Sequence, residues 1–286
     1  MKHFLLVLGV LSTLIGWNQS DKPAYLIFDG DGKEVKYSKM MKDLNSAKVI
    51  LFGEFHDNPI SHWLQFEMTV DLFNSKRSNL VLGAEMFEAD NQLIIDEYFK
   101  DQISDKSFQA ECRLWPNYNT DYKPIFEFAK DQKIPFIATN VPRRYASMVY
   151  KKGMESLYSI DSSAREYVAP LPIEVDTTLS QYQSLMHSMG GHGGVNFVTA
   201  QAIKDATMAH FILKNMDEKS VFLHFNGAYH SDYKQGITHY LKKSITASNI
   251  KTITTVTQDD ISELSEENRK KADFIIVVPT SMTRTH

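Results

Sequence analysis

Cysteine is almost absent from this chain of 286 residues, because Cys112 is the only one. An intrachain disulfide is therefore excluded, and the folded chain must rely on core packing for its stability. A lipid anchor would need a cysteine just after an apolar run near the start, and none is present there. The sequence therefore does not support lipidation.

An excess of basic residues is also missing, since 31 Lys and Arg stand against 35 Asp and Glu. Binding along a phosphate backbone needs such an excess, so we expect no nucleic-acid partner. Hydrophobic residues make up 43% and charged residues 23% of the chain, which is ordinary for a globular protein and excludes general disorder. The length allows one large domain with an insertion, or two domains.

A long apolar run is missing as well, because residues 4–16 are too few for a comfortable membrane span. Lys2 and His3 precede this run and give it a positive start. The pattern predicts a signal peptide over residues 1–20 and an exported protein of the periplasm or cell envelope. A single uncleaved membrane anchor is the alternative.

The chain is organised around residues 48–57, KVILFGEFHD. Residues 49–52 have the β-branching and length of a buried strand, and Asn58 with Pro59 supplies the start of a helix. Glu54 and His56 would then project to the same side at the carboxyl end of a strand, where open α/β sheets bind ligands. The alternative is an ordinary turn whose polar residues only cap the helix.

Strands and helices alternate along the rest of the chain, which predicts a mostly parallel β-sheet flanked by helices. We expect an α/β sheet domain over residues 24–140 and 216–286, and a smaller inserted helical domain over 141–215. Further strands are expected at 80–82, 135–140, 221–226, 253–257 and 274–279. Helices are expected at 59–75, 91–100, 107–112, 125–132, 200–213 and 262–271.

Polar side chains follow four of these strands and could converge on one site. They are Glu54, His56, Glu85, Arg143 and His230. Two carboxylates and two imidazoles could bind a divalent metal, or could act as a general acid and base. Carboxylates buried close together need a cation, an arginine or a shared proton, and the arginine could supply one charge.

Several motifs in this order resemble the haem-binding ChaN-like family, part of the wider Tiki and erythromycin-esterase-like superfamily. The resemblance covers about residues 48–242. The motifs are Gly53-Glu54-x-His56-Asp57-Asn58, Gly83-x-Glu85-Met86-Phe87, Trp115-Pro116-x-Tyr118-x-x-Asp121-Tyr122-x-Pro124, Asn140-x-Pro142-Arg143, Ala200-Gln201-x-x-x-Asp205-x-Thr207-Met208-Ala209 and Gly227-x-x-His230.

The resemblance implies an exported protein in which a homodimer encloses haem and a tyrosine holds the iron. No motif identifies that tyrosine, so Tyr150, Tyr158, Tyr167 and Tyr182 of the insertion are the candidates. Six of the twelve methionines also lie between residues 141 and 216, which suits an adaptable apolar cavity or simply a methionine-rich core.

Two functions remain open from the sequence. The first is a haem-binding protein of haem or iron acquisition, with haem and cell-envelope uptake components as partners. The second is a metal-dependent hydrolase of the Tiki or esterase type. In the second, Glu54, His56, Glu85 and His230 bind metal or move protons, and Arg143 stabilises developing negative charge. A non-catalytic scaffold is a third interpretation.

Overall fold

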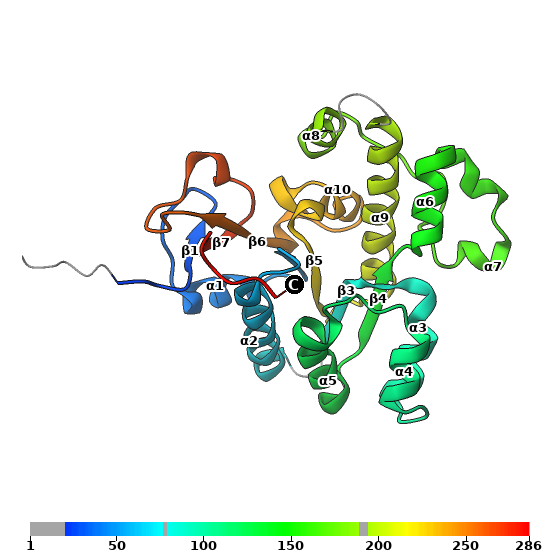
Figure 1. The fold of residues 1–286 in the computed structure, drawn as a ribbon, viewed down its shortest axis with the longest axis horizontal. Helices are drawn as coiled ribbons and strands as arrows, with labels where there is room; N and C mark the ends of the chain where they lie inside the picture. The colour runs from blue at the N-terminus through cyan, green and yellow to red at the C-terminus, as the bar shows by residue number, and fades with distance from the viewer. Residues whose placement is uncertain (1–20, 77–78, 189–193, 286) are drawn as a thin grey trace, which may run out of the picture.

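One seven-stranded sheet forms the centre of the computed structural model, which describes residues 21–76, 79–188 and 194–285 (Figure 1). The strand order is β1-β7-β6-β2-β5-β3-β4, and only the edge strand β1 is antiparallel to its neighbour. The predicted mostly parallel α/β sheet is therefore confirmed, whereas the expected signal peptide lies outside the described residues. The strands are β1 (Leu26–Asp29), β2 (Val49–Glu54), β3 (Leu80–Glu88), β4 (Phe136–Asn140), β5 (Val221–Gly227), β6 (Ile250–Gln258) and β7 (Phe274–Pro279).

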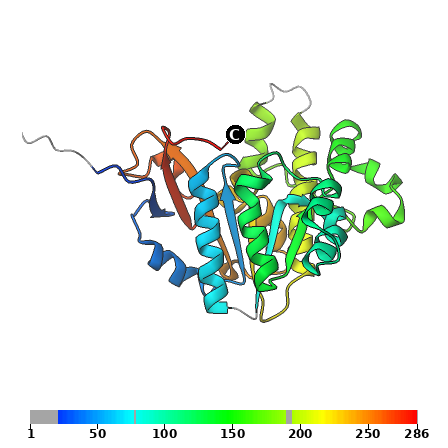
Figure 2. The same cartoon turned by 60° about the horizontal axis from the view of Figure 1, so that its bottom comes forward.

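Helices cover both faces of the sheet. Strand β2 alternates between them: Ile50 and Phe52 join the core under α1, α2 and α5, while Val49 and Leu51 join the core under α6, α9 and α10. Figure 2 shows α2 and α5 lying side by side across the first face. The helices are α1 (Tyr37–Leu44), α2 (Pro59–Lys76), α3 (Gln92–Phe99), α4 (Asp105–Glu111), α5 (Lys123–Gln132), α6 (Arg143–Lys152), α7 (Ser162–Arg165), α8 (Ser180–Ser188), α9 (Gly194–Lys214) and α10 (Ile237–Leu241). None of these described helices is both long and apolar enough to cross a membrane.

The segment 141–215 contains helices α6 to α9 and no strand among its described residues. Its longest helix, α9, packs on the sheet through Ile203, Met208 and Ile212, all fully buried in the same cluster as Leu51. Helix α6 packs in turn against α9. The N-terminal end of α9 rises above the sheet beside α8 (Figure 1). Phe197 and Gln201 near this end line a cleft at the strand ends.

Strand β2 is central, with β5 on one side and β6 on the other, and Glu54 at its end is in register with Gly227. The predicted helix start is confirmed, since the Oδ1 atom of Asn58 accepts a hydrogen bond of 3.0 Å from the backbone N–H of Ser61. Strand β3 is longer than predicted. It runs past Glu85, where its pairing with β4 shifts register.

The helix predicted at residues 262–271 is wrong. Only a single turn forms, Glu266–Asn268, and Lys270 has a positive φ of 61° that no α-helix contains. Side chains take the backbone groups that a helix would use: Asp260 accepts from the N–H of Ser262, and the Gln258 amide donates to the carbonyl of Glu263. Polar residues near their own backbone compete with helix formation in this way.

Candidate functional site

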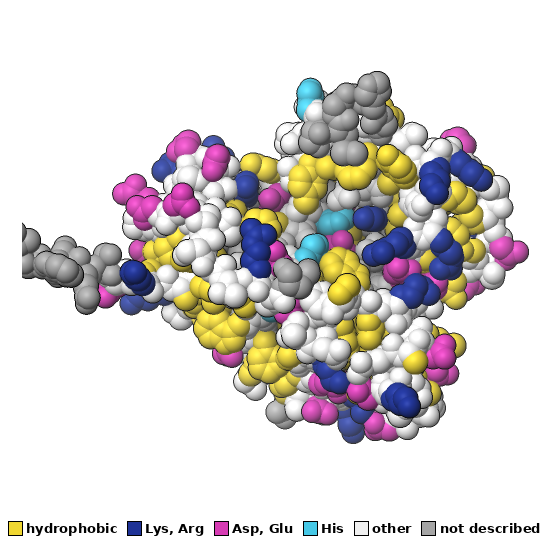
Figure 3. Space-filling view, in the orientation of Figure 1, with side chains coloured by type: hydrophobic (Ala, Val, Ile, Leu, Met, Phe, Trp, Pro, Cys, Tyr) yellow, Lys and Arg dark blue, Asp and Glu magenta, His cyan; other side chains and the backbone are white. Residues whose placement is uncertain are grey.

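A cleft of about 650 Å³ opens at the carboxyl ends of β2, β5, β3 and β4. Because these strands are neighbours in the sheet, the predicted polar residues meet although they are far apart in the sequence. Glu54, His56, Glu85, Arg143 and His230 all line this cleft. Figure 3 shows histidine side chains in the middle of this face, with apolar and basic side chains around them.

The carboxylate of Glu54 is 1% exposed and is surrounded by donors. Its Oε1 accepts hydrogen bonds from His56 Nδ1 at 2.8 Å and from the Tyr122 hydroxyl at 2.7 Å. Its Oε2 accepts one of 2.5 Å from the Gln65 amide, with His62 Nδ1 at 3.5 Å. The carboxylate is therefore fixed in one orientation, and it can orient the His56 ring.

His56 is the more accessible of the two predicted histidines, with 37% of its side chain exposed. Its ring packs edge-on against Trp115, with the centroids 4.8 Å apart. Burial alone would lower the pKa of His56, but the hydrogen bond to Glu54 and the negative charges of Glu85 and Glu54 outweigh it and raise the pKa. The ring fits because residue 227 is a glycine: a Cβ there would lie only 2.8 Å from His56 Nε2.

A second histidine, His230, lies between two buried carboxylates. Its Nε2 is 3.1 Å from Oε1 of Glu85, and its Nδ1 is 2.5 Å from Oδ1 of Asp205. Burial opposes the charge on this ring, yet the two carboxylates raise the pKa of His230 to about 9. His230 is therefore an imidazolium at neutral pH.

The two carboxylates respond differently to this imidazolium. Burial favours the neutral form of Glu85, but the charge and hydrogen bond of His230 hold the pKa of Glu85 well below its usual range. Glu85 also accepts a 2.8 Å hydrogen bond from the backbone N–H of Gly227. Burial raises the pKa of Asp205 despite His230. Glu85 is thus the firmly ionised partner.

Sequence reasoning did not assign roles to Asp205, Gln201, Tyr122 or Gln65, although each contacts a predicted site residue. A signal existed for the first two: they are four residues apart on α9 and so share one face of a helix. Only the packing of α9 beside the end of β5 shows that this face meets His230.

The predicted metal ligands form two separate carboxylate–imidazole pairs, Glu54 with His56 and Glu85 with His230. Within residues 21–76, 79–188 and 194–285, no group of three or more His, Cys, Asp or Glu is placed to hold a metal ion. Arg143, the first residue of α6, is exposed and lines the cleft, but it makes no ion pair with a described carboxylate. His230 supplies the charge expected from this arginine.

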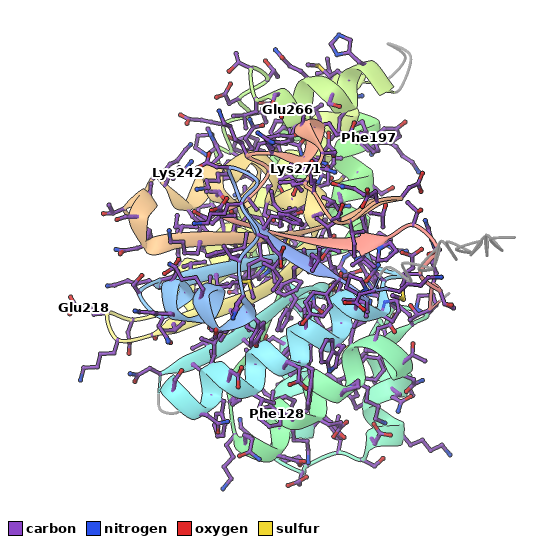
Figure 4. All side chains as sticks on the ribbon, turned by 90° about the vertical axis from the view of Figure 1, so that its left-hand side faces the viewer. Phe128, Phe197, Glu218, Lys242, Glu266 and Lys271 are labelled. Atoms are coloured by element: carbon purple, nitrogen blue, oxygen red, sulfur yellow. The ribbon has the colours of Figure 1, made fainter. Side chains whose placement is uncertain are left out.

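The predicted haem-ligand tyrosines lie in different surroundings. Tyr150 is 39% exposed, and its ring packs edge-on against Phe197, a residue of the cleft wall labelled in Figure 4. Tyr158 is 47% exposed and Tyr167 is half-buried, and neither lines the cleft. Tyr182 is 1% exposed.

The hydroxyl of Tyr182 donates a hydrogen bond of 2.7 Å to Oδ2 of Asp205. Burial and the neighbouring carboxylate raise the pKa of Tyr182 far above its ordinary value. The phenol is therefore held protonated in the core.

Solved structures of three proteins are similar to this chain to different degrees. The solved structure described as cofacial haem binding to ChaN of Campylobacter jejuni is similar with a TM-score of 0.68 at 20% identity, covering 89% of this chain and 96% of that chain. A succinoglycan biosynthesis protein gives 0.51 at 11% identity, covering 87% and 92%. An erythromycin esterase in its open conformation gives 0.45 at 9% identity, covering 77% and 72%. No curated protein sequence matches the chain.

The family model for haem-binding uptake proteins of the Tiki superfamily, ChaN, matches residues 40–241. This range includes both carboxylate–imidazole pairs and the whole of α6 to α9. Since the match spans well over half of the 286 residues, the protein belongs to the haem-binding ChaN family of the Tiki superfamily.

Proposed function

We propose that this protein binds haem and serves in haem or iron acquisition at the cell envelope. Family membership supports the ligand, and the apolar wall beside the cleft is the observation that carries it. Leu185 of α8 and Phe197 of α9 form this wall, and Val141 continues it above β4. We assign the wall to a helical insertion, residues 141–215, set between sheet segments 24–140 and 216–286.

The residues of this wall fit haem. Apolar side chains can cover the porphyrin ring, and a tyrosine phenolate is a known ligand of haem iron. Tyr150 packs on Phe197 and its hydroxyl has no hydrogen-bond partner among the described residues. We therefore assign Tyr150 as the iron ligand. Its bond to the iron would be visible in the absorbance spectrum of the haem complex.

A second copy of the chain would complete the haem site. Val195, two residues from Phe197 at the start of α9, is 63% exposed, and Tyr150, which packs against Phe197, is also exposed. A flat haem against this surface would leave one of its faces in water. Closing a dimer over two such faces removes more apolar area, at about 25 cal/mol per Å². We therefore propose a homodimer coupled to haem binding.

Haem titration followed by absorbance tests the proposal. Wild-type protein should bind haem tightly and sediment as a dimer when loaded. Tyr150→Phe should shift the haem spectrum and weaken binding by about tenfold or more, because the iron loses its ligand. Tyr158→Phe is the matched control and should titrate as wild type. An unchanged haem spectrum in Tyr150→Phe would show that Tyr150 is not the iron ligand. Haem-loaded protein that sediments as a monomer would contradict the proposed homodimer.

Export is part of the proposal and needs its own test. The charged start followed by an apolar run motivates it. N-terminal sequencing of material from the cell envelope should find a mature chain beginning beyond residue 20. Recovery of intact Met1 in the cytoplasm would contradict export.

A second candidate function is hydrolysis, and the Glu54–His56 pair favours it. A buried carboxylate that fixes one ring nitrogen leaves the other free to take a proton from water or substrate. His56 Nε2 lies beside Gly227 in the cleft wall. In this hypothesis His230 stays charged, and Arg143 stabilises negative charge that develops on the substrate.

Glu54→Gln separates the two functions. If the pair is catalytic, the variant should lose ester-hydrolysis activity while its haem affinity stays close to wild type. If the pair has only a structural role, Glu54→Gln should instead have a lower thermal stability than wild type, and neither protein should hydrolyse esters. Metal analysis of the same sample, before and after chelation, tests whether an ion takes part. Wild-type protein that hydrolyses no ester would end this hypothesis.

A further inference from the structure

Three cationic side chains line the cleft without a close ion pair to a described carboxylate. Arg143 comes from the start of α6, Lys204 from α9 and Lys271 from the loop before β7. Within the described part of the chain, none of the three makes a side-chain hydrogen bond or an ion pair. The neighbouring Arg144 behaves differently, since it pairs with Asp90 at 2.5 Å.

The carboxylates of the cleft already have other partners. Glu54 is held by His56, Tyr122 and Gln65, and Glu85 by His230. Lys204 is near enough to lower the pKa of Glu85, but His230 dominates that effect. Two further lining carboxylates are also engaged: Glu88 pairs with Arg113 at 2.9 Å, and Asp232 accepts a 2.6 Å hydrogen bond from Thr254. The charge of Lys271 likewise opposes the rise that burial causes in the pKa of Asp232, but it is not the main cause. None of the three cations is thus neutralised by a close ion pair within the described residues.

Asn140 adds an independent sign of a ligand. It ends β4, lines the cleft and is 8% exposed. Its amide nitrogen donates to the backbone carbonyl of Glu85 at 3.0 Å, which fixes the side chain. Its Oδ1 is buried and has no hydrogen-bond partner. A buried acceptor left unpaired is costly, so a small shift of the side chain toward the cleft would let a ligand hydroxyl or a water carried by the ligand satisfy it.

The cations stand on both walls of the cleft. Arg143 and Lys204 share one wall because α6 and α9 pack against each other, whereas Lys271 precedes β7 on the side of β6. Figure 4 labels Phe197 and Lys271, which belong to α9 and to the segment before β7. Cations that converge from two sides raise the local concentration of an anion.

We propose that the cleft binds an organic anion through its carboxylates. Arg143 and Lys204 hold one carboxylate, Lys271 attracts negative charge from the opposite wall, and Asn140 accepts a hydrogen bond from a hydroxyl or a bound water. The carboxylates come either from the propionates of haem or from a free hydroxycarboxylate. The first source rests on the haem binding proposed above, and the second does not.

Binding titrations with three probes decide between the sources. The probes are haem, haem dimethyl ester and citrate, and the proteins are wild type, Arg143→Gln, Lys204→Gln and the matched control Arg144→Gln. If propionates are the anion, Arg143→Gln and Lys204→Gln should each weaken haem binding by about tenfold and leave the ester unchanged. If a free hydroxycarboxylate is the ligand, the same variants should weaken citrate binding and leave haem unchanged.

Thermal melts of all four proteins confirm that they are folded, and the exposure of Arg143 and partial exposure of Lys204 favour this. The proposal is overturned if both variants titrate as Arg144→Gln does with every probe, or if wild type binds neither haem nor citrate. A wild type that binds citrate but not haem would refute the haem function while supporting this site.

Discussion

The Nδ1 atom of His230 lies 2.5 Å from Oδ1 of Asp205, so a residue that follows β5 is fixed by one on α9. The other nitrogen of the same ring meets Glu85 from β3. One imidazolium therefore joins a helix to two strands of the sheet. It also compensates the buried negative charge of Glu85, the task that sequence reasoning gave to Arg143.

His230 should make the stability of the protein depend on pH in a specific direction. Its folded pKa of about 9 exceeds the ordinary histidine value of 6.5, so its contribution is fully present below pH 6.5 and disappears as the pH rises through 9. The shift corresponds to on the order of 3 kcal/mol. Urea unfolding of wild type should therefore show this decline, and His230→Gln should be less stable at pH 6 and lack the decline. Parallel pH profiles for the two proteins would contradict the assignment.

Gly227→Ala should disturb His56 without straining the backbone. Residue 227 has φ −57° and ψ 139°, which alanine adopts readily, but the added Cβ would lie 2.8 Å from His56 Nε2. The ring must move and weaken its hydrogen bond to Glu54. We expect the raised pKa of His56 to fall toward its ordinary value in an NMR titration. An unchanged titration would show that the glycine does not set the ring position.

The C-terminal residues brace the turn that carries His56. The Thr285 hydroxyl donates a 2.8 Å hydrogen bond to Oδ2 of Asp121, and Arg284 pairs with Asp57 at 2.8 Å. Thr285→Val keeps the shape but removes the hydroxyl, so it should lower the free energy of unfolding by about 1 kcal/mol. Thr283→Val, at an exposed position nearby, is the control in the same denaturation experiment. Equal stability of the two variants would show that the bond contributes nothing.

Tyr182→Phe should affect folding and not haem. The change removes the hydrogen bond of 2.7 Å to the buried carboxylate of Asp205, which should cost about 1.5–3 kcal/mol. Since the phenol lies in the core, the haem absorbance spectrum should match that of wild type. Thermal melts and haem titration of one sample measure both. A spectrum altered as in Tyr150→Phe would make Tyr182 the iron ligand.

Local patterns predicted the elements of the fold better than their arrangement. The apolar run at residues 49–52 could be recognised as a strand buried on both faces, and Asn58 as the start of α2, because each depends on neighbouring residues alone. The strand order could not be read, since nothing local shows that β2 lies between β5 and β6. The same limit explains the wrong helix at 262–271, where contacts of Gln258 replaced helical hydrogen bonds.

The site followed the same rule. Period-two alternation was enough to place Glu54 and His56 on one side, and their side chains do meet. Their supports, Tyr122 and Gln65, come from other segments and carry no local sign of this role. The spacing of Asp205 from Gln201 shows that both lie on one face of a helix. The sequence does not show that this face meets His230 at the end of β5.

The position of β2 in the sheet constrains when this site can exist. Strand β2 begins at Val49, but its two neighbours in the sheet, β5 and β6, begin only at Val221 and Ile250. While the chain is being synthesised, this fully buried strand must therefore wait for most of the remaining polypeptide before it can pair. Contacts at such long sequence separation form slowly, and the apolar segments stay exposed and prone to aggregation until they form. The Glu85–His230 pair therefore cannot form before residue 230 has been synthesised, whereas Glu54 and His56 are already close in sequence.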